Sequence, residues 1–188
     1  TIISQSNYMK RSLINKSRIS IKDKVVVIKN LVDFSRIDKN LIKDFTPNYD
    51  YLVYVGRLSP EKNIIQLIKA FNIIKNKTKF KLLLIGDGDQ HDKIKHAIQN
   101  FDLEGKVLMM GFQSNPYKYI YNSSGLILFS SYEGFPNVVL EAMYCKTPTI
   151  ISDFEGAKEL VIHKQNGFIV KRNNINILSD QILEMINN

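Results

Sequence analysis

The stretch that decides the fold is Gly125-Leu-Ile-Leu-Phe-Ser-Ser-Tyr-Glu-Gly-Phe-Pro-Asn-Val-Val-Leu-Glu141. Residues 125–129 form a short apolar run, which is typical of a strand buried on both faces of a sheet. Residues 137–145 have a helical pattern, and Pro136 suits the first turn of that helix, where its missing N–H costs nothing. The stretch therefore predicts a strand, a tight loop and a helix N-terminus. Open α/β sheets bind ligands at such a place, and the free amides there favour an anion.

Two carboxylates frame this predicted anion site. Glu133 lies in the loop, and Glu141 lies about one turn into the helix. Carboxylates beside a phosphate would repel it, so they fit only if they accept hydrogen bonds from neutral hydroxyls on either side of it. A sugar nucleotide has this layout, with sugar hydroxyls, a diphosphate and ribose hydroxyls. The alternative, for the two carboxylates alone, is a solvated loop residue and a surface helix residue.

Outward from this stretch, strands and helices alternate along the chain. We expect strands at 51–55, 80–85, 107–110, 125–129, 149–151 and 168–170, and helical segments at 60–75, 91–100, 115–121, 137–145, 156–161 and 176–186. Such alternation indicates βαβ units with right-handed crossovers and a parallel sheet. The predicted fold class is therefore α/β, with a Rossmann-like, doubly wound parallel sheet.

A second motif, Gly56-Arg-Leu-Ser-Pro-Glu-Lys-Asn63, follows the predicted strand at 51–55. Since a helix is expected to begin near Pro60, Arg57 and Lys62 should project from the carboxyl edge of the sheet. There they could neutralise a diphosphate, Arg as a planar fork and Lys as a point charge. The alternative is a solvated Arg and a surface Lys. However, a Lys near a helix N-terminus is slightly unfavourable unless an anion is bound there.

The string from Glu133 to Ala142 resembles the E-x7-E signature of retaining GT-B glycosyltransferases of family GT4 (glycosyltransferase group 1), and the motif around Arg57 and Lys62 also matches that family. The resemblance extends over nearly the whole chain and implies the C-terminal, donor-binding domain of such an enzyme. It implies catalytic roles for Arg57, Lys62 and Glu133. It also implies donor-binding roles for a larger set of residues: Gly56, Gly86, Gly88, Gly111, Phe112, Gly134, Phe135, Pro136, Asn137, Val138 and Glu141.

In the mechanism that the resemblance implies, Arg57, Lys62 and the helix N-terminus stabilise the negative charge on the leaving diphosphate. Glu141 holds the ribose hydroxyls. Glu133 holds the sugar, with help from the loop amides of Gly134, Phe135 and Asn137. This scheme needs no metal, because the protein supplies the cations, and no cofactor is expected. The nucleotide sugar is the substrate, and UDP is the first choice of nucleotide.

Three further segments match the family less strongly. Gly86-Asp-Gly88 and Met110-Gly-Phe112 follow predicted strands and resemble turns that pass close to the donor, although Asp-Gly pairs also form ordinary turns. Residues 155–159 read Glu-Gly-Ala-Lys-Glu where many members have Gly-Gly-x-Pro-Glu. Lys158 is therefore a departure from the family pattern. Glu159 keeps an acidic position, which is expected to cap the local helix or to support the site.

Residues 1–30 resemble the end of the family's N-terminal, acceptor-side domain and its hinge. A strand at 1–5, a basic amphipathic helix at 7–16 and a strand at 25–28 precede Asn30-Leu-Val-Asp33. We therefore expect residues 1–30 to be a remnant of that domain, whose larger part lies outside this chain. Residues 31–188 are expected to be the sugar-nucleotide-binding domain. The alternative is that residues 1–20 form a membrane-surface helix, although so short a basic apolar segment binds weakly.

Composition narrows the other possibilities. The net charge of +8 suits a phosphate, an anionic membrane or nucleic acid, but the lysines are scattered and no nucleic-acid motif is present, so we expect no nucleic-acid partner. No apolar run approaches the roughly 18 residues of a membrane span. Cys145 is the only cysteine and lies in an apolar helix, which indicates a buried thiol. The three histidines lack metal-ligand spacing and are expected at the surface: His91, His96 and His163.

The predicted function is transfer of a hexose or N-acetylhexosamine from a nucleotide sugar to a glycan or lipid-linked acceptor, in bacterial surface polysaccharide or lipopolysaccharide synthesis. The acceptor is expected to bind through the N-terminal domain. The alternatives are a non-catalytic donor-binding fragment and, within GT-B, a sugar-nucleotide epimerase or phosphorylase. The resemblance implies a cytoplasmic location at the inner face of the membrane, and the basic charge is compatible with peripheral membrane association. The sequence leaves open the nucleotide, the sugar, the acceptor, the linkage and the oligomeric state.

Overall fold

The computed structural model describes residues 1–42, 45 and 47–187. Its largest part is a six-stranded parallel sheet in the order β5-β4-β3-β6-β7-β8. The strands are β3 (Tyr51–Val55), β4 (Lys81–Ile85), β5 (Val107–Gly111), β6 (Gly125–Leu128), β7 (Thr149–Ser152) and β8 (Phe168–Val170). The chain winds outward from β3 in one direction and from β6 in the other. This is the doubly wound α/β arrangement that the alternation of elements predicts.

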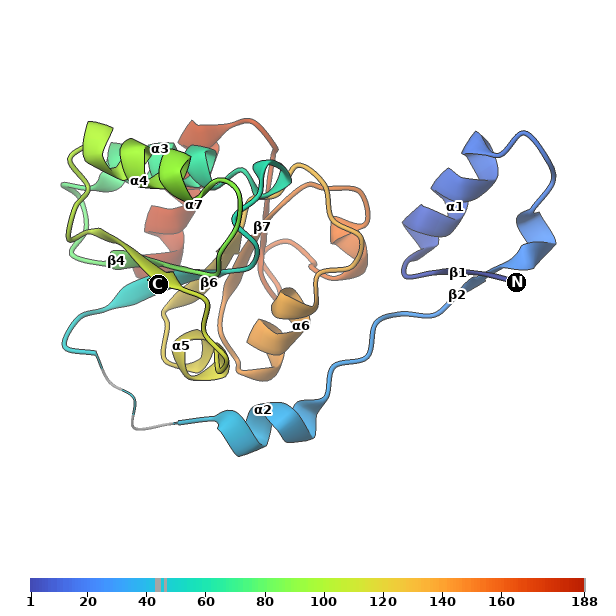
Figure 1. Ribbon diagram of the computed structural model, residues 1–188, viewed down its shortest axis with the longest axis horizontal. Coiled ribbons are helices and arrows are strands. Elements are labelled where there is room, and N and C mark those ends of the chain that lie inside the picture. The colour runs from blue at the N-terminus through green and yellow to red at the C-terminus, as the bar shows by residue number, and fades with distance from the viewer. Residues whose placement is uncertain (43–44, 46, 188) are drawn as a thin grey trace.

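Helices cover both faces of this sheet (Figure 1). On one face lie α3 (Ile64–Ile74), α4 (His91–Asn100) and α7 (Ile175–Asn187), and on the other lie α5 (Tyr117–Tyr121) and α6 (Asn137–Tyr144). Within the layers, α3 packs against α4 and α7, and α5 packs against α6. The central strands are therefore covered on both sides, and their apolar residues form the core of the protein, for example Leu52, Val53, Leu126, Ile127 and Ile150.

Helix α3 shows why the sequence folds in this way. Its buried residues Ile64, Leu67, Ile68, Phe71 and Ile74 recur at the three- and four-residue spacing of one helix face. Burying each of these side chains contributes about 1.5–3 kcal/mol relative to exposure. The stripe therefore fixes which face of α3 meets the sheet, and with it the position of the loop that precedes α3.

The first residues form a separate small unit. β1 (Ile2–Ser4), α1 (Asn7–Lys16) and β2 (Val25–Val27) make a two-stranded parallel sheet with one crossover helix, and η1 (Lys22–Lys24) precedes β2. In Figure 1 this unit lies beside the large sheet, with α1 facing the end where β7 and α6 lie. The strands and the helix occur where they were predicted. That this unit is the remnant of an acceptor-side domain, with a boundary at residue 30, stays a prediction.

Helix α2 (Phe34–Asn40) is a finding that the sequence pattern did not predict. Asp33 caps it by accepting a hydrogen bond from Arg36 N at 3.1 Å. The helix packs against α5 and α6, and the Phe34 ring stacks on that of Tyr144 with 4.4 Å between centroids. Only Ile37 is buried in its seven residues. An apolar period is therefore hardly visible in the sequence.

The predicted helix at 60–75 is wrong in its first turn. Pro60–Lys62 forms a 3-10 turn, η2, and Asn63 adopts a left-handed conformation (φ 51°) before α3 begins. Smaller differences concern the ends of other elements: the helix predicted at 115–121 begins at Tyr117, and the helical turn predicted at 156–161 is confined to η3 (Ala157–Glu159). The break at Asn63 matters most, because it orients Lys62.

Candidate active site

The two main sequence motifs meet where the sheet changes direction. β3 and β6 are neighbours, and the chain winds outward from them on opposite sides. In open parallel sheets such a switch point leaves a crevice outside the carboxyl ends of the strands. Gly56 and Arg57 follow β3, while Glu133 follows β6. The fold therefore brings the two motifs together at the crevice in which such folds bind ligands.

Lys62 and Glu133 form an ion pair across this crevice. Lys62 Nζ lies 2.8 Å from Glu133 Oε1 and 2.9 Å from Oε2, and the two side chains are 19% and 9% exposed. Ser130 Oγ donates to Glu133 Oε1 at 2.6 Å. The sequence predicts different ligands for Lys62 and Glu133, and the structure adds a direct contact between them. Because an unpaired charge would be costly at such low exposure, each side chain supplies the partner that the other needs and holds it in place.

The segment that carries Lys62 is fixed to the loop after β6. The left-handed conformation of Asn63 lets its Nδ2 donate to Ser131 Oγ at 2.6 Å. In the opposite direction, Ser131 N donates to the Glu61 carbonyl at 2.8 Å. The Glu61 carboxylate accepts from Ser59 Oγ at 2.6 Å, and this hydrogen bond lowers the pKa of Glu61. The loops after β3 and β6 therefore form one connected structure.

Arg57 differs from Lys62 because its side chain is exposed. Its carbonyl accepts a hydrogen bond from Tyr54 Oη at 2.7 Å, so the backbone is anchored at the carboxyl end of β3 while the side chain stays exposed. Burial raises the pKa of Tyr54, and the nearby charges of Glu133 and Glu61 raise it further. The phenol therefore stays a hydrogen-bond donor at all ordinary pH values. An anchored backbone with an exposed guanidinium suits contact with an anionic ligand.

Gly86 and Gly88 have a packing reason to be glycine. A Cβ at Gly86, where φ is 137°, would lie 1.9 Å from the Gly56 carbonyl oxygen, and a Cβ at Gly88 would lie 2.4 Å from that of Leu58. The turn after β4 thus lies directly against the backbone of the turn after β3. The predicted close approach to a donor and this observed close approach of two backbones are compatible uses of the same residues.

Gly111 and Phe112 lie further along the same carboxyl edge, at the end of the edge strand β5. The Gly111 carbonyl accepts from Gly86 N at 2.9 Å, which connects this strand end to the turn after β4. Gly111 has φ 64°, in the left-handed region, and Phe112 is 78% exposed. An exposed aromatic ring at this edge could pack against a flat ligand group, and the donor-binding role of Phe112 stays a prediction.

The loop after β6 leads directly into the first turn of α6 at the carboxyl edge of the sheet. Phe135 and Pro136 are buried, Gly134 and Val138 are half-buried, and Asn137 is exposed. Asn30, from the segment that follows β2, donates from Nδ2 to the Phe135 carbonyl at 3.0 Å and to Asn137 Oδ1 at 2.8 Å. The first amides of a helix have no partner within the helix and carry positive partial charge. This end of α6 is therefore suited to bind an anion.

Glu141 lies on α6 and faces α2. It is half-buried, and burial raises its pKa, while the nearby Arg36 guanidinium of α2 opposes this effect. An ionised carboxylate with limited solvent contact is a strong acceptor for the hydroxyl groups of a ligand. The unpredicted helix α2 thus contributes a cation to the surroundings of a predicted site residue.

A cavity of about 330 Å³ separates the loop after β6 from α1. Its lining combines aromatic and apolar groups with carboxylates, a hydroxyl and an ammonium: Tyr8, Met9, Ser12, Leu13, Lys16, Tyr132, Glu133 and Glu155. Glu133 is therefore accessible from this cavity although most of its side chain is covered. The small N-terminal unit forms the opposite wall.

Glu159 has a different role from the local helix cap that the sequence suggests. Its carboxylate binds the N-terminus of α1, accepting from Tyr8 N at 2.8 Å, from Asn7 N at 3.2 Å and from Asn7 Nδ2 at 3.3 Å. Burial would raise the pKa of Glu159, but the hydrogen bonds from Tyr8 and Asn7 outweigh this and lower it. Glu159 therefore joins the small unit to the large domain.

Five residues that position the site were not predicted: Asn63, Ser130, Ser131, Ser152 and Arg172. The two loop serines lie directly after an apolar strand and before Glu133, which is a signal that could have been used. Nothing in the local sequence around Ser152 or Arg172 indicates that they approach the loop after β6. Their role depends on the strand order.

The histidines and the cysteine lie outside this site. His91 Nδ1 is 3.0 Å from Asp92 Oδ1 at an exposed helix start, and His163 Nδ1 accepts from Ile169 N at 3.0 Å. Cys145 is buried, as predicted, and burial raises the pKa of its thiol to about 11. Within residues 1–42, 45 and 47–187, no group of three or more His, Cys, Asp or Glu side chains could hold a metal ion.

A doubly wound parallel sheet with cations, carboxylates and a helix N-terminus at its switch point defines a domain suited to a phosphorylated, hydroxyl-rich ligand. Comparison with known protein families identifies the family to which this domain belongs. Residues 37–188 match the model of the family described as glycosyl transferases group 1, and the chain belongs to this family. The match includes every predicted site residue.

Relatives support the same assignment. The chain is 32% identical over 175 residues to the N-acetylgalactosamine-N,N'-diacetylbacillosaminyl-diphospho-undecaprenol 4-alpha-N-acetylgalactosaminyltransferase of Campylobacter jejuni, covering 93% of this chain and 47% of the relative. It is 30% identical over 137 residues to the poly(ribitol-phosphate) alpha-N-acetylglucosaminyltransferase of Staphylococcus aureus, covering 72% of this chain and 28% of the relative. The chain thus spans about half the length, or less, of these curated relatives.

Solved structures agree with the fold. S. aureus TarM, crystallised with UDP, superposes with a TM-score of 0.87 at 26% identity, covering 99% of this chain and 36% of TarM. Anabaena HepE, crystallised with UDP and glucose, gives a TM-score of 0.85 at 25% identity, covering 99% of this chain and 53% of HepE. The large domain therefore has the Rossmann-like fold found in GT-B glycosyltransferases.

Proposed function

We propose that this chain binds the nucleotide-diphosphate sugar donor of a retaining glycosyltransferase. The observation that carries the proposal is the Lys62–Glu133 ion pair at the switch point. It places an ammonium beside a carboxylate of the loop that leads from β6 into α6, in a chain that belongs to a glycosyltransferase family. A diphosphate would bind to the Lys62 ammonium and to the N-terminus of α6. The hydroxyls of a sugar would bind to the Glu133 carboxylate.

In this proposal the leaving diphosphate lies between Arg57, Lys62 and the first turn of α6. A Lys ammonium has three donors, and Glu133 accepts from Lys62 at 2.8 Å and 2.9 Å. The remaining donor capacity of Lys62 would bind the phosphate, while Glu133 would keep oxygen lone pairs for sugar hydroxyls. Fixed charges of this kind stabilise developing negative charge without reorganisation, and loss of one group typically costs about 10²–10³ in rate.

Glu141 would bind the ribose hydroxyls, one helix turn from the diphosphate position. Burial raises the pKa of Glu141 and the nearby Arg36 guanidinium opposes this rise; in its ionised form the carboxylate would accept hydrogen bonds from these hydroxyls. We propose a UDP-sugar as the donor, since TarM and HepE were both crystallised with UDP. The scheme uses protein cations only, and we propose that transfer requires neither a metal nor a cofactor.

For the acceptor, we propose a glycan or a lipid-linked glycan of a bacterial surface polymer, with a hexose or an N-acetylhexosamine transferred. The support comes from relatives whose names state such acceptors, a diphospho-undecaprenol glycan and poly(ribitol phosphate). Among the described residues, no helix is long and apolar enough to cross a membrane. Peripheral attachment at the inner face of the cytoplasmic membrane is part of the proposal and is motivated by the net charge of +8.

The experiment is calorimetric titration of the chain with UDP, GDP and ADP, repeated on Glu141→Ala. We expect one nucleotide to bind and the variant to bind it roughly tenfold more weakly, because hydrogen bonds to a charged group are lost. The matched control is Glu104→Ala, an exposed Glu on the loop between α4 and β5. Equal affinity of Glu141→Ala and the wild type would refute the ribose contact, and no binding of any nucleotide would refute a complete donor site in this chain.

The stereochemical part of the proposal has its own test. Proton NMR of the transfer product, made by an enzyme that contains this domain, should show the anomeric configuration of the donor sugar. An inverted product would contradict retention while leaving the donor site unaffected.

A further inference from the structure

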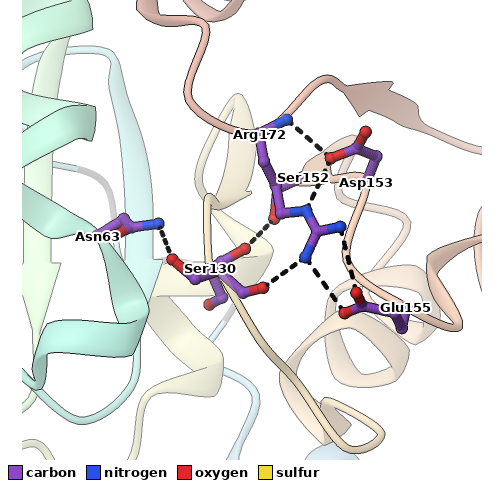
Figure 2. Close-up of polar contacts among 7 residues, drawn as sticks. Asn63, Ser130, Ser152, Asp153, Glu155 and Arg172 are labelled. Carbon is purple, nitrogen blue, oxygen red and sulfur yellow. Dashed lines mark hydrogen bonds and ion pairs between the residues drawn. The ribbon is translucent and has the colours of Figure 1, made fainter. Parts of the chain in front are cut away.

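Arg172 connects the carboxyl ends of three neighbouring strands. It follows β8, and its side chain is 33% exposed. Its backbone N donates to Asp153 Oδ1, just after β7, at 2.7 Å, and its Nε donates to the same oxygen at 3.2 Å. Its Nη1 donates to the Ser131 carbonyl, in the loop after β6, at 2.9 Å. Figure 2 shows the guanidinium between these two strand ends.

The same guanidinium also holds Glu155. Nη1 lies 3.2 Å from Glu155 Oε2, and Nη2 lies 3.3 Å from Oε1. This two-point contact uses the planar fork of Arg, which a Lys ammonium cannot reproduce. Arg172 therefore fixes the orientation of one carboxylate and one backbone carbonyl at the same time.

The contact with Ser131 matters because Glu133 is two residues away. Ser130 Oγ donates to Glu133 Oε1 at 2.6 Å, and the Ser130 carbonyl accepts from Ser152 Oγ at 2.5 Å. The hydroxyl of Ser131 accepts from Asn63 Nδ2 at 2.6 Å. The backbone that presents Glu133 is thus held from the α3 side by Asn63 and from β7 and β8 by Ser152 and Arg172 (Figure 2).

Both carboxylates controlled in this way face one cavity. Glu133 and Glu155 line the space of about 330 Å³ between the loop and α1. Glu155 has two of its roughly four acceptor positions occupied by Arg172, so hydroxyl groups in the cavity can reach the others.

We propose that Arg172 is a positioning residue of the sugar-binding part of the donor site. It touches no substrate; it fixes the Ser130–Glu133 loop and the Glu155 carboxylate, so that both carboxylates meet the hydroxyls of the donor sugar. This inference rests on the proposed function, because it assumes that the cavity beside Glu133 receives the sugar. It adds a residue for which the local sequence gives no signal.

The decisive variant is Arg172→Lys, which keeps the charge and removes the fork. Its matched control is Arg18→Lys, an exposed Arg in the small N-terminal unit. We expect the affinity for UDP to stay within about twofold of the wild type. The affinity for UDP-glucose or UDP-N-acetylglucosamine, whichever the wild type binds, should fall roughly tenfold, as expected when hydrogen bonds to a charged group lose their geometry. A merely structural role would change both affinities alike.

Hydrogen exchange gives a second measurement that needs no ligand. The Ser131 amide donates to the Glu61 carbonyl at 2.8 Å, and in Arg172→Lys its exchange should become at least tenfold faster, while amides of β3 and β4 stay protected. If Arg172→Lys does not fold, Asp153→Asn is the substitute, because it removes a charged acceptor of Arg172 that does not line the cavity, with a smaller change in the same direction. Unchanged Ser131 exchange, or an unchanged ratio of UDP to UDP-sugar affinity, would overturn the inference.

The two proposals fail in different ways. If the wild-type chain binds no nucleotide sugar, the donor site proposed for this chain fails, and the role of Arg172 in the sugar site fails with it. The exchange measurement then still decides whether Arg172 fixes the loop. If the wild type binds a UDP-sugar and Arg172→Lys behaves identically, only the role of Arg172 is wrong.

Discussion

The two walls of the cavity beside Glu133 are built differently. One wall consists of the loop after β6 and of Glu155 after β7. The Lys62–Glu133 ion pair, with side chains 19% and 9% exposed, joins this wall to the loop after β3. The other wall is α1, which has no buried residue. It is joined to the large domain mainly at its N-terminus, through Glu159. The first wall is held rigidly by its ion pair and hydrogen bonds. The second wall is a small unit held by contacts that are largely open to solvent.

This difference separates two tasks. Charges that stabilise a leaving group must be in place before the reaction, and interlocked loops achieve this without reorganisation. A weakly joined wall can move as a body, because interfaces between units of a chain with few buried contacts permit relative motion. We therefore expect changes in the first wall to affect chemistry and stability strongly, and changes in the second wall to affect closure and local order.

The largest effect should come from Lys62→Ala, which removes the ion pair of the first wall. In the full-length enzyme we expect transfer to fall by at least 10²–10³, because the leaving diphosphate loses a fixed cation and Glu133 loses its partner. Circular dichroism should show a folded protein with a lowered melting temperature. Lys77→Ala, an exposed Lys on the turn after α3, is the matched control. A variant with wild-type rates would remove Lys62 from the mechanism.

The packing that supports the first wall can also be disturbed by a substitution that changes no charge. In Gly86→Ala the new Cβ would lie 1.9 Å from the Gly56 carbonyl oxygen, at a residue with φ 137°. We expect a loss of unfolding free energy of about 3 kcal/mol, from the combined clash and backbone strain. Gly105→Ala is the control, since its φ is 77° but no atom lies within 4 Å of the new Cβ. That variant should lose only about 1 kcal/mol. Equal losses in urea unfolding would contradict the close packing of the two turns.

Much of the fold could be predicted from sequence, because its signals are local. The apolar runs of β4 and β6 and the stripe of α3 depend only on neighbouring residues, and the structure confirms them. Helix α2 was missed because a seven-residue helix with one buried residue has hardly any periodic signal. The turn at Asn63 was missed because a left-handed residue other than glycine is stabilised by a distant partner, Ser131.

The sequence indicates individual residues of the candidate site, but it does not indicate which of these residues contact one another. Resemblance to a family gives Lys62 and Glu133 separate roles, but only the strand order β3-β6 shows that they touch. Arg172 lies 41 residues from Ser131, and its contact depends on β6, β7 and β8 being adjacent. Glu159 illustrates the same limit, since it binds the N-terminus of α1, 152 residues away in the chain, and not the local helix.

A smaller effect is expected in the second wall, from Glu159→Gln. The carboxylate caps α1, and replacing a good helix cap typically costs about 1 kcal/mol. We expect faster amide exchange at residues 7–10 of α1, with unchanged exchange in β3 and β4 and unchanged nucleotide affinity. Asp180→Asn, on the exposed part of α7, is a control that removes an acidic group without a link to α1. Global destabilisation in Glu159→Gln would show that the second wall is not a separately held unit.

The same contact should make the second wall sensitive to acid. A carboxyl group with a lowered pKa in the folded state stabilises that state above its ordinary pKa, and this contribution disappears as the pH falls through the lowered value. The pKa of Glu159 lies below the ordinary value for a Glu carboxyl group, because the hydrogen bonds from Tyr8 and Asn7 outweigh the effect of burial. Protection of the α1 amides should therefore be constant from neutral pH to about pH 5 and fall below pH 4.5, after correction for the intrinsic exchange rate. In Glu159→Gln this fall should be absent, since the amide does not titrate. If the variant kept the same pH dependence, another group would hold α1, and the division into a rigid and a movable wall would lose its main connection.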